Sequence, residues 1–286
     1  MRFPEFSGEW EMVSLQDIAT INPKSDPLQN TFIYIDLEAV EKGELRKIQE
    51  IMREEAPSRA QRVIDNNDIL FQCVRPYQKN NYIHRILNTS NQQWVASTGY
   101  AQIRTTELPN YIYHLLNTDE FNRKVMVRCT GSSYPAINSE DLATIHLYYT
   151  PDKKEQLKIS RLLDLLDKRI ATQNKIIEDL KKLKSAISKH LFARKDLLET
   201  TICLSNIATL KNGYAFQSGK YNALGKWKIL TITNVSGERY INDEDYNCII
   251  NLPIDIQDHQ VLKEGDILIS LTGNVGRVSL CKDGDY

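Results

Sequence analysis

The chain has 286 residues, of which 41% are hydrophobic and 26% are charged, a composition typical of a folded protein with room for two domains and not of a disordered one. Its net charge of −1 excludes a general electrostatic attraction to nucleic acid, so any DNA binding must depend on local patches. No run approaches the roughly 20 apolar residues of a membrane-spanning helix, and the amino terminus lacks an apolar signal core. We therefore expect no association with a membrane.

The five cysteines are widely separated, with no CxxC pair and no cluster with the five histidines. This pattern argues against a zinc site and is typical of a reducing cytoplasm, where free cysteines pack as small apolar side chains. The sequence also lacks a P-loop lysine motif and a glycine-rich cofactor loop after a strand. We expect a cytoplasmic protein with no metal and no cofactor.

Charge is distributed unevenly along the chain. Residues 1–150 carry 15 basic and 19 acidic side chains, residues 151–197 carry 13 and 7, and residues 198–286 carry 8 and 11. The middle segment is therefore basic, whereas both flanking segments are mildly acidic. This pattern predicts an α+β chain in three parts, with a first domain at 1–150, a helical spacer at 151–197 and a partial second domain at 198–286.

The first segment combines strand-like runs with one helical pattern. Apolar or alternating runs bounded by turn residues predict strands at 32–37, 68–74, 94–103 and 145–149. Helical spacing predicts a helix over 109–128. Its buried face would consist of Tyr113, Leu116, Phe121 and Val125. The Gly, Ser and Pro residues that follow, at 129–137, predict an exposed loop.

The second segment predicts one long helix. Thr150 suits the N-cap, Pro151 the first helical position and Asp152 the positive end of the helix dipole. Arg194 and Lys195 suit its carboxyl end. Apolar residues recur at alternating steps of three and four, as in a coiled coil. They are Leu163, Leu166, Ile170, Ile177, Leu180, Ile187 and Leu191.

A helix of some 44 residues spans about 65 Å at 1.5 Å per residue, which is too long to pack against one domain of ordinary size. We name its apolar stripe, formed by the seven residues just given, the seam. No other part of the chain has the length and period to cover the seam. We therefore expect its partner to be a helix of another chain.

The third segment repeats the first. Residues 15–21 are echoed by 204–210, residues 33–35 by 229–231, and residues 67–71 by 265–269. Three matches in the same order, with slowly drifting offsets, indicate a duplicated domain. Strands are predicted at 227–233, 261–262, 266–271 and 276–280. Counterparts of the 109–128 helix, the glycine loop and the long helix are absent, so we expect an incomplete copy.

This order of parts resembles the specificity (S) subunits of type I restriction-modification systems. Residues 10–21 are similar to the opening segment of that family, and residues 67–70 and 265–268 to its recurrent "gDIL" element. Residues 56–60 and 74–76 resemble one subtype of its recognition domain. Residues 131–137, leading through 149–151 to 155–156, resemble the family's loop, strand and entry to the helix, and residues 180–192 the end of that helix.

The resemblance implies a non-catalytic subunit whose two recognition domains each read half of a split DNA sequence. Its helices would dock methyltransferase (M) subunits. Methyl transfer would belong to those subunits and ATP-driven cleavage to the restriction (R) subunits. A full member has two recognition domains and two antiparallel helices, whereas this chain has one of each and part of a second domain. We therefore expect a half-subunit that pairs through its helix with a second copy or with another S fragment.

Two patches are candidates for contact with double-stranded DNA. In the first, over 56–85, Gln72 and Gln78 lie among the candidates Arg59, Arg62, Arg75, Tyr77, Lys79, Asn80, Asn81 and Arg85. Arg, Asn and Gln match base edges, while Lys and Tyr suit phosphates. The second patch is Arg123, Lys124, Arg128, Ser132, Ser133 and Tyr134. The alternatives are a solvated loop for the first patch and a dipole-stabilised helix end for the second.

Catalytic signatures are weak, and we predict no catalytic residue. Pro151-Asp152 and Asp179-Leu180-Lys181 fit the loose nuclease pattern PD…(D/E)xK. On one continuous helix, however, these carboxylates would lie about 40 Å apart and could not share a metal. Our preferred interpretation is a DNA-specificity subunit. The alternatives are a coiled-coil interaction protein or an inactive gene fragment that does not bind DNA.

Overall fold

The chain combines strands and helices, as predicted for an α+β protein. The computed structural model describes residues 2–85, 92–193 and 201–282. It divides into two compact units, Met1–Lys189 and His190–Tyr286. The predicted helix end at Arg194 and Lys195 lies outside the described residues.

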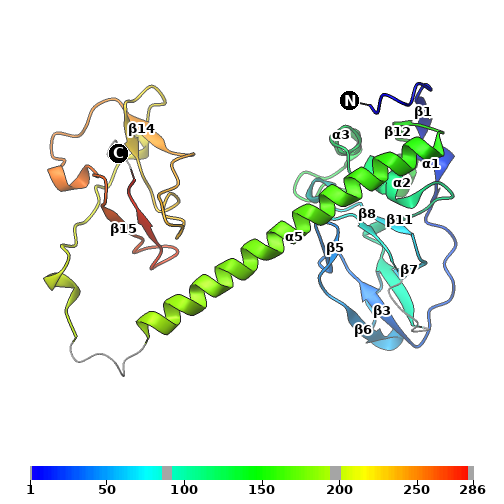
Figure 1. Ribbon diagram of the computed structural model, residues 1–286, viewed down its shortest axis with the longest axis horizontal. Coiled ribbons are helices and arrows are strands. Elements are labelled where there is room, and N and C mark those ends of the chain that lie inside the picture. Colours follow the sequence, from blue (N-terminus) through cyan, green and yellow to red (C-terminus); the bar gives the residue numbers. More distant parts are fainter. Residues whose placement is uncertain (1, 86–91, 194–200, 283–286) are drawn as a thin grey trace. The chain divides into compact units, whose positions relative to one another are not determined.

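Two four-stranded sheets form the centre of the first unit (Figure 1). The first has the order β6 (Gln49–Met52), β3 (Thr31–Ile35), β10 (Gln93–Ser97) and β7 (Ala60–Ile64), with β3 and β10 parallel. The second is antiparallel, with the order β2 (Thr20–Ile21), β11 (Tyr100–Arg104), β8 (Ile69–Gln72) and β9 (Tyr82–Ile83). The chain passes from one sheet to the other between β10 and β11.

The single strand predicted at 94–103 is wrong, because residues 98–99 divide it into β10 and β11. The Gly99 amide donates to Ser97 Oγ at 3.2 Å, which closes the turn. A Cβ on Gly99 would lie 2.9 Å from the Leu37 side chain, so the close approach of this turn to Leu37 favours glycine. One apolar run therefore supplies strands to both sheets.

Two short strand pairs and three short helices complete this part of the first unit. Strand β1 (Glu11–Ser14) pairs antiparallel with β12 (His146–Tyr149), and β4 (Val40–Glu41) pairs with β5 (Glu44–Leu45). The short helices are α1 (Leu15–Ile18), η1 (Arg53–Glu55) and α4 (Ser139–Ala143). The β1–β12 pair holds the start of the domain beside the strand that leads into the long helix.

The predicted helix at 109–128 is two helices, α2 (Pro109–Leu116) and α3 (Asp119–Arg128). Asn117 ends the first, and Thr118 caps the second, because its Oγ1 accepts the Phe121 amide at 3.3 Å. Leu116, Phe121 and Val125 are buried as predicted, whereas Tyr113 is half-buried.

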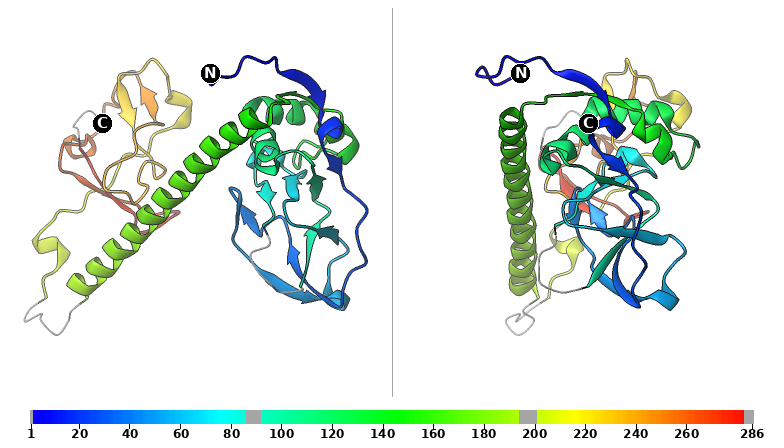
Figure 2. Two further views of the ribbon diagram at one scale, coloured as in Figure 1. Left: turned by 45° about the vertical axis from the view of Figure 1, so that its right-hand side comes forward. Right: turned by 90° about the vertical axis from the view of Figure 1, so that its right-hand side faces the viewer.

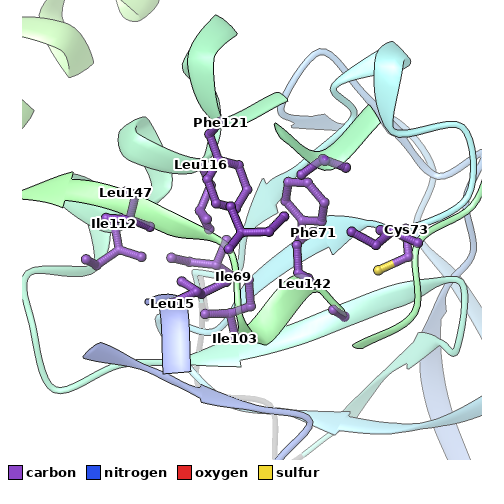
Figure 3. Packing of buried hydrophobic residues seen from close by; sticks show 14 of the residues in the cluster. Leu15, Ile69, Phe71, Cys73, Ile103, Ile112, Leu116, Phe121, Leu142 and Leu147 are labelled. Carbon is purple, nitrogen blue, oxygen red and sulfur yellow. The ribbon is translucent and has the colours of Figure 1, made fainter. Parts of the chain in front are cut away.

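Helices α2 and α3 pack on β8 and β11 and enclose the main core (Figure 3). Phe71 of β8 meets Phe121 of α3 edge to face, with ring centroids 5.8 Å apart. Ile69, Ile103 and Leu116 are fully or almost fully buried around them. The second sheet and its two helices therefore form one rigid layer.

Helix α5 runs uninterrupted from Lys153 to Phe192 (Figure 2). It begins two residues later than predicted, and Asp152 is its N-cap. The Asp152 carboxylate accepts the amides of Lys154 at 2.8 Å and Glu155 at 3.3 Å. Thr150, predicted as the cap, instead donates its hydroxyl to Glu155. Only Glu155, Gln156 and Ser160 are buried on this helix.

The described residues of the second unit form two antiparallel strand pairs. Strand β13 (Trp227–Ile229) pairs with β14 (Asn247–Ile249), and β15 (Ile267–Ile269) pairs with β16 (Val278–Leu280). Single-turn helices are η4 (Leu204–Asn206), η5 (Ser218–Lys220) and η6 (Asp258–Gln260). The strand predicted at 261–262 is not formed.

One turn has the same hydrogen bonds in both units, which supports the predicted duplication. The Asp68 carboxylate accepts the Asp65 amide at 2.7 Å, and the Asp266 carboxylate accepts the Lys263 amide at 2.8 Å. In each unit the residue before the aspartate has a positive φ, 74° at Asn67 and 90° at Gly265. Each aspartate then leads into an antiparallel strand pair, β8–β9 or β15–β16.

Candidate nucleic-acid interface

A rigid turn presents the centre of the first predicted patch. The 3-10 helix η2 (Pro76–Gln78) lies between Arg75 and Lys79, which both adopt the left-handed conformation, with φ of 55° and 52°. Such φ values are uncommon for residues other than glycine and cost free energy. The surrounding structure must therefore hold this turn in place.

Two buried side chains, Gln72 and Asn81, anchor the turn. Gln72 is buried, and its Oε1 accepts the Asn80 amide at 3.2 Å while its Nε2 donates to Gln78 Oε1 at 3.0 Å. Asn81 is also buried, accepts the Gln72 amide at 2.8 Å and donates to Asn117. These contacts connect the end of β8 to the turn and to the end of α2.

The glycine loop of the second patch lies against this turn. Thr130 and Ala136 exchange two backbone hydrogen bonds of 2.9 Å, which closes the loop. Gly131, at φ 88°, allows the turn between them. The Arg75 amide donates to the Pro135 carbonyl at 2.7 Å, and the Arg75 guanidinium lies over the Tyr134 ring, 4.3 Å from its centroid. The structure therefore brings the two predicted patches together.

Further backbone bonds extend this surface to β7. The Thr98 amide donates to the Arg59 carbonyl at 2.9 Å, and the Cys73 amide donates to the Gly99 carbonyl at 3.0 Å. On the other side, Lys79 reaches Asp119 at the start of α3 with a distance of 2.5 Å. Arg123 lies one turn further along the same face of α3.

We name this surface the basic rim. It consists of Arg59, Arg62, Arg75, Tyr77, Lys79, Arg123, Ser132, Ser133 and Tyr134. Tyr77 and Tyr134 are 51% and 63% exposed, which is high for aromatic side chains. The rim therefore combines basic groups with aromatic faces, as nucleic-acid interfaces do.

Most charges of the rim are not neutralised by the protein. Arg59, Arg62, Arg75 and Arg123 form no ion pair with any residue in the described part of the chain. Arg62 is half-buried, its Nε has no hydrogen-bond partner there, and burial lowers the pKa of its guanidinium. A partly desolvated cation without a partner is unfavourable in the free protein and would be stabilised by an anion such as phosphate.

Lys79 is the exception among these charges. Its ammonium group holds the pKa of the Asp119 carboxyl below its ordinary value. Asp119 is almost fully exposed, so this pair is well hydrated and contributes little stability.

Five predicted contact residues make other contacts. Asn80 accepts the Lys42 amide, Asn81 is buried, and Arg85 donates to Asn110 of α2. Lys124 pairs with Glu120 and donates to the His146 carbonyl, and Arg128 donates to the Asp141 carbonyl and to Thr144. Because these side chains are used within the domain, we leave them out of the rim.

Polar contacts fix the first turns of α5 to the domain. Glu155 is fully buried and accepts both nitrogens of the Arg2 fork at 2.6 and 2.7 Å, as well as Trp10 Nε1. Asp164 accepts Asn110 at 2.5 Å and contacts His114 Nε2 at 2.7 Å. The orientation of the helix relative to the basic rim is therefore set by buried or half-buried partners.

The described residues of the first unit leave the remainder of α5 largely exposed. Leu163 is half-buried, and the other six residues of the seam are between 47% and 64% exposed. Leu165, Ile176 and Leu183 widen this apolar stripe and are also exposed. An exposed apolar stripe of this length is typical of an interaction surface.

The nuclease-like pattern of the sequence does not form a metal site in the described residues. In the described residues, no group of three or more His, Cys, Asp or Glu side chains could hold a metal. Asp152 caps α5 and Asp179 lies 27 residues further along the same helix, about 40 Å away at 1.5 Å per residue, so the nuclease-like pattern forms no site. His84 is fully buried, which lowers its pKa to about 4.

None of the helices in the described residues is both long and apolar enough to cross a membrane.

A family model and a known protein match the sequence of this chain. Residues 7–182 match the family model for the type I restriction modification DNA specificity domain. A stretch of 195 residues, 66% of the chain, is 24% identical to the specificity subunit of the type I restriction enzyme HindI from Haemophilus influenzae. This match spans 39% of that relative's length.

Two solved structures share the fold. A chain from a study of complex assembly and conformational transition in the type I R-M system has a TM-score of 0.60 and 20% identity, over 98% of this chain and 73% of that one. The S subunit of a type I restriction-modification system from M. genitalium has a TM-score of 0.50 and 14% identity, over 100% of this chain and 74% of that one.

Proposed function

The chain belongs to the family of type I restriction-modification DNA specificity domains, and on that premise we propose that its first unit reads one half of a bipartite DNA target. The family assigns the chain a role in DNA sequence specificity. Specificity subunits are themselves non-catalytic, so the chain would direct enzymes carried by other subunits.

The observation that best supports this proposal is the set of arginines without ion pairs around the basic rim. Arg59 and Arg62 lie at β7, Arg75 lies beside η2 and Arg123 lies in α3, so the fold brings three separate segments together. Outside the rim, Arg2, Arg46 and Arg104 are neutralised by carboxylates, whereas Arg85 and Arg128 donate to neutral groups of their own domain. Since the chain has a net charge of −1, this local concentration is what an acidic ligand would meet.

The partners follow from the same premise. We infer that α5 docks the methyltransferase subunits, through which restriction subunits join the complex. The seam would pair with the helix of a second copy or of another S fragment. Two basic rims would then be held at a fixed separation along the duplex. We place this assembly in the cytoplasm.

The salt dependence of DNA binding tests the role of the rim. Each phosphate neutralised contributes about 0.9 to the slope of log K against log salt, so the double variant Arg59→Ala/Arg62→Ala should lower the slope by about 2. Binding would be measured by fluorescence anisotropy with the full chain, with and without its M subunit.

A matched control is the double variant Lys124→Ala/Arg128→Ala, which removes the same charge from side chains that contact the protein. It should leave the slope unchanged. Equal slopes for both double variants would contradict the proposed interface. No DNA binding by the wild-type chain, alone or with its M subunit, would favour the alternative of an interaction protein.

A further inference from the structure

The anchoring network below η2 determines which atoms Gln78 offers to a ligand. A backbone amide can only donate, so the Asn80 amide must bond to the oxygen of the Gln72 side chain. Gln72 therefore presents its nitrogen to Gln78, and this nitrogen must meet the oxygen of Gln78 at 3.0 Å. The amide orientation of both side chains follows from one backbone group.

Gln78 is exposed, and the network leaves its side-chain nitrogen as the group that can bond to a ligand. This nitrogen makes no hydrogen bond with the described residues, whereas the oxygen already accepts one. A freely rotating glutamine can offer a donor and an acceptor together, which is the pattern that reads adenine. Gln78 is held in an orientation that favours donation.

Arg75, on the other side of η2, is fixed in a similar way. Its backbone is held by the Pro135 carbonyl, and its guanidinium lies over the Tyr134 ring. A guanidinium that lies over an aromatic ring keeps its N–H groups free to donate. The Arg75 fork is therefore positioned before any ligand arrives.

We propose that the η2 turn reads guanine, with Arg75 as the base-contacting residue, Gln78 as a second donor, and Tyr134 and Gln72 as the residues that position them. This inference rests on the proposed function. Guanine presents two acceptors, O6 and N7, on one major-groove edge, and these match the Arg75 fork. The half-site read by the first unit therefore contains at least one guanine.

The other bases match this turn less well. Adenine and cytosine present amino donors in the major groove, which would face the donors of Arg75. Thymine offers a single acceptor beside a methyl group. Lys79 is paired with Asp119 and carries a point charge, so it suits a phosphate and adds no base preference.

The test begins with a library of randomised DNA duplexes, selected with the full chain and its M subunit. Each guanine of the selected half-site is then replaced by 7-deazaguanine, which keeps Watson–Crick pairing and O6 but lacks the N7 acceptor. For the wild-type chain, one such replacement should weaken binding on the order of tenfold. For Arg75→Ala, the same replacement should have no further effect.

Two further pairs of variants test positioning. Tyr134→Phe keeps the aromatic face and should retain the response to 7-deazaguanine, whereas Tyr134→Ala should reduce it. Gln72→Met frees the Gln78 amide to turn, so that its side chain can offer an acceptor beside its donor. Adenine should therefore become acceptable at the base pair that Gln78 contacts. Lys79→Ala should weaken binding to all duplexes equally. Circular dichroism and thermal unfolding would show that each variant is folded.

The outcomes separate the two proposals. Selection of a guanine whose N7 matters to the wild type and not to Arg75→Ala supports the inference. A selected half-site without guanine, or an equal response in both proteins, overturns the inference and leaves the proposed function intact. Binding without any sequence preference overturns both.

Discussion

Glu155 is a fully buried carboxylate at the start of α5, and its partners make stability depend on pH. The hydrogen bond from Arg2 is the main cause that lowers its pKa, and it outweighs the opposing effect of burial. The ionised form is therefore favoured in the folded state. Its contribution to stability is complete above the ordinary value of 4.5 and is lost as pH falls through the lower folded pKa.

We predict that Glu155→Gln is less stable than the wild type near neutral pH and that this difference shrinks below about pH 4.5. The measurement is thermal unfolding of both proteins between about pH 3 and 7. Glu178→Gln is the control, because Lys182 also lowers the pKa of Glu178 but this pair is exposed. A difference between Glu155→Gln and the wild type that stays constant with pH would contradict the assignment.

Residue types at the interface could be predicted from the sequence, but their partners could not. Arg75, Lys124 and Arg128 have the same charge in the sequence, yet Lys124 and Arg128 reach backbone carbonyls of their own domain. Asn81 belongs to a polar run that suggests solvent exposure, but it is buried beneath η2. These differences depend on contacts between distant segments, which the local pattern does not contain.

At the scale of elements, the duplicated turn provides an internal comparison. Asp68 is buried and accepts Gln102 and a bidentate contact from Arg104 in addition to the turn amide. Asp266 makes the same turn contact from an exposed position. The two aspartates share one local role, and only Asp68 carries a buried charge that must be compensated.

We predict that Asp68→Asn destabilises the first unit by about 2 kcal/mol, because it leaves part of the Arg104 fork and the Gln102 donor without an acceptor. The cost stays below that of a fully buried pair, since Arg104 is 40% exposed. Asp266→Asn should cost less than about 1 kcal/mol. Hydrogen exchange of β8–β9 in one variant and β15–β16 in the other measures both effects. Equal losses would show that Arg104 adds nothing.

Two elements that were predicted as continuous, the 94–103 strand and the 109–128 helix, contain sequence signals for the break that the structure shows. Gly99 lies inside the run predicted as one strand, and an isolated glycine there suggests a bulge or a close approach of the backbone to a neighbour. Thr118, followed by Asp119 and Glu120, has the pattern of a helix start, which indicates a break in the 109–128 helix. The strand order of the two sheets could not be predicted, because β3 pairs with β10 across about 60 intervening residues in the sequence.

At the scale of the whole molecule, α5 is a long helix whose apolar stripe is left exposed by the described residues of the first unit. Ile177, near the middle of the seam, is 50% exposed, and Ile170 and Leu180 on either side are 58% exposed. In the described residues, the hydrogen bonds and ion pairs that join α5 to the rest of the first unit come from its first turns. An isolated helix gains little from propensity alone. Pairing of two seams would bury these side chains and stabilise the helix.

We predict that the chain self-associates through the seam and that Ile177→Asp weakens this association by at least about a hundredfold. Two buried carboxylates, one from each copy, would face each other without cationic partners. Sedimentation equilibrium over a range of protein concentrations measures the effect. Amide protection within α5 should increase with concentration for the wild type and not for the variant.

Lys175→Asp is the control, because it introduces the same carboxylate on the face of α5 away from the seam. It should leave the dimer unchanged, since its side chain would remain in water after pairing. An equal loss of association in both variants would mean that general charge repulsion, rather than the seam, decides the outcome. A wild-type chain that stays monomeric at high concentration would contradict self-association. The seam would then require a different helix, such as that of another S fragment.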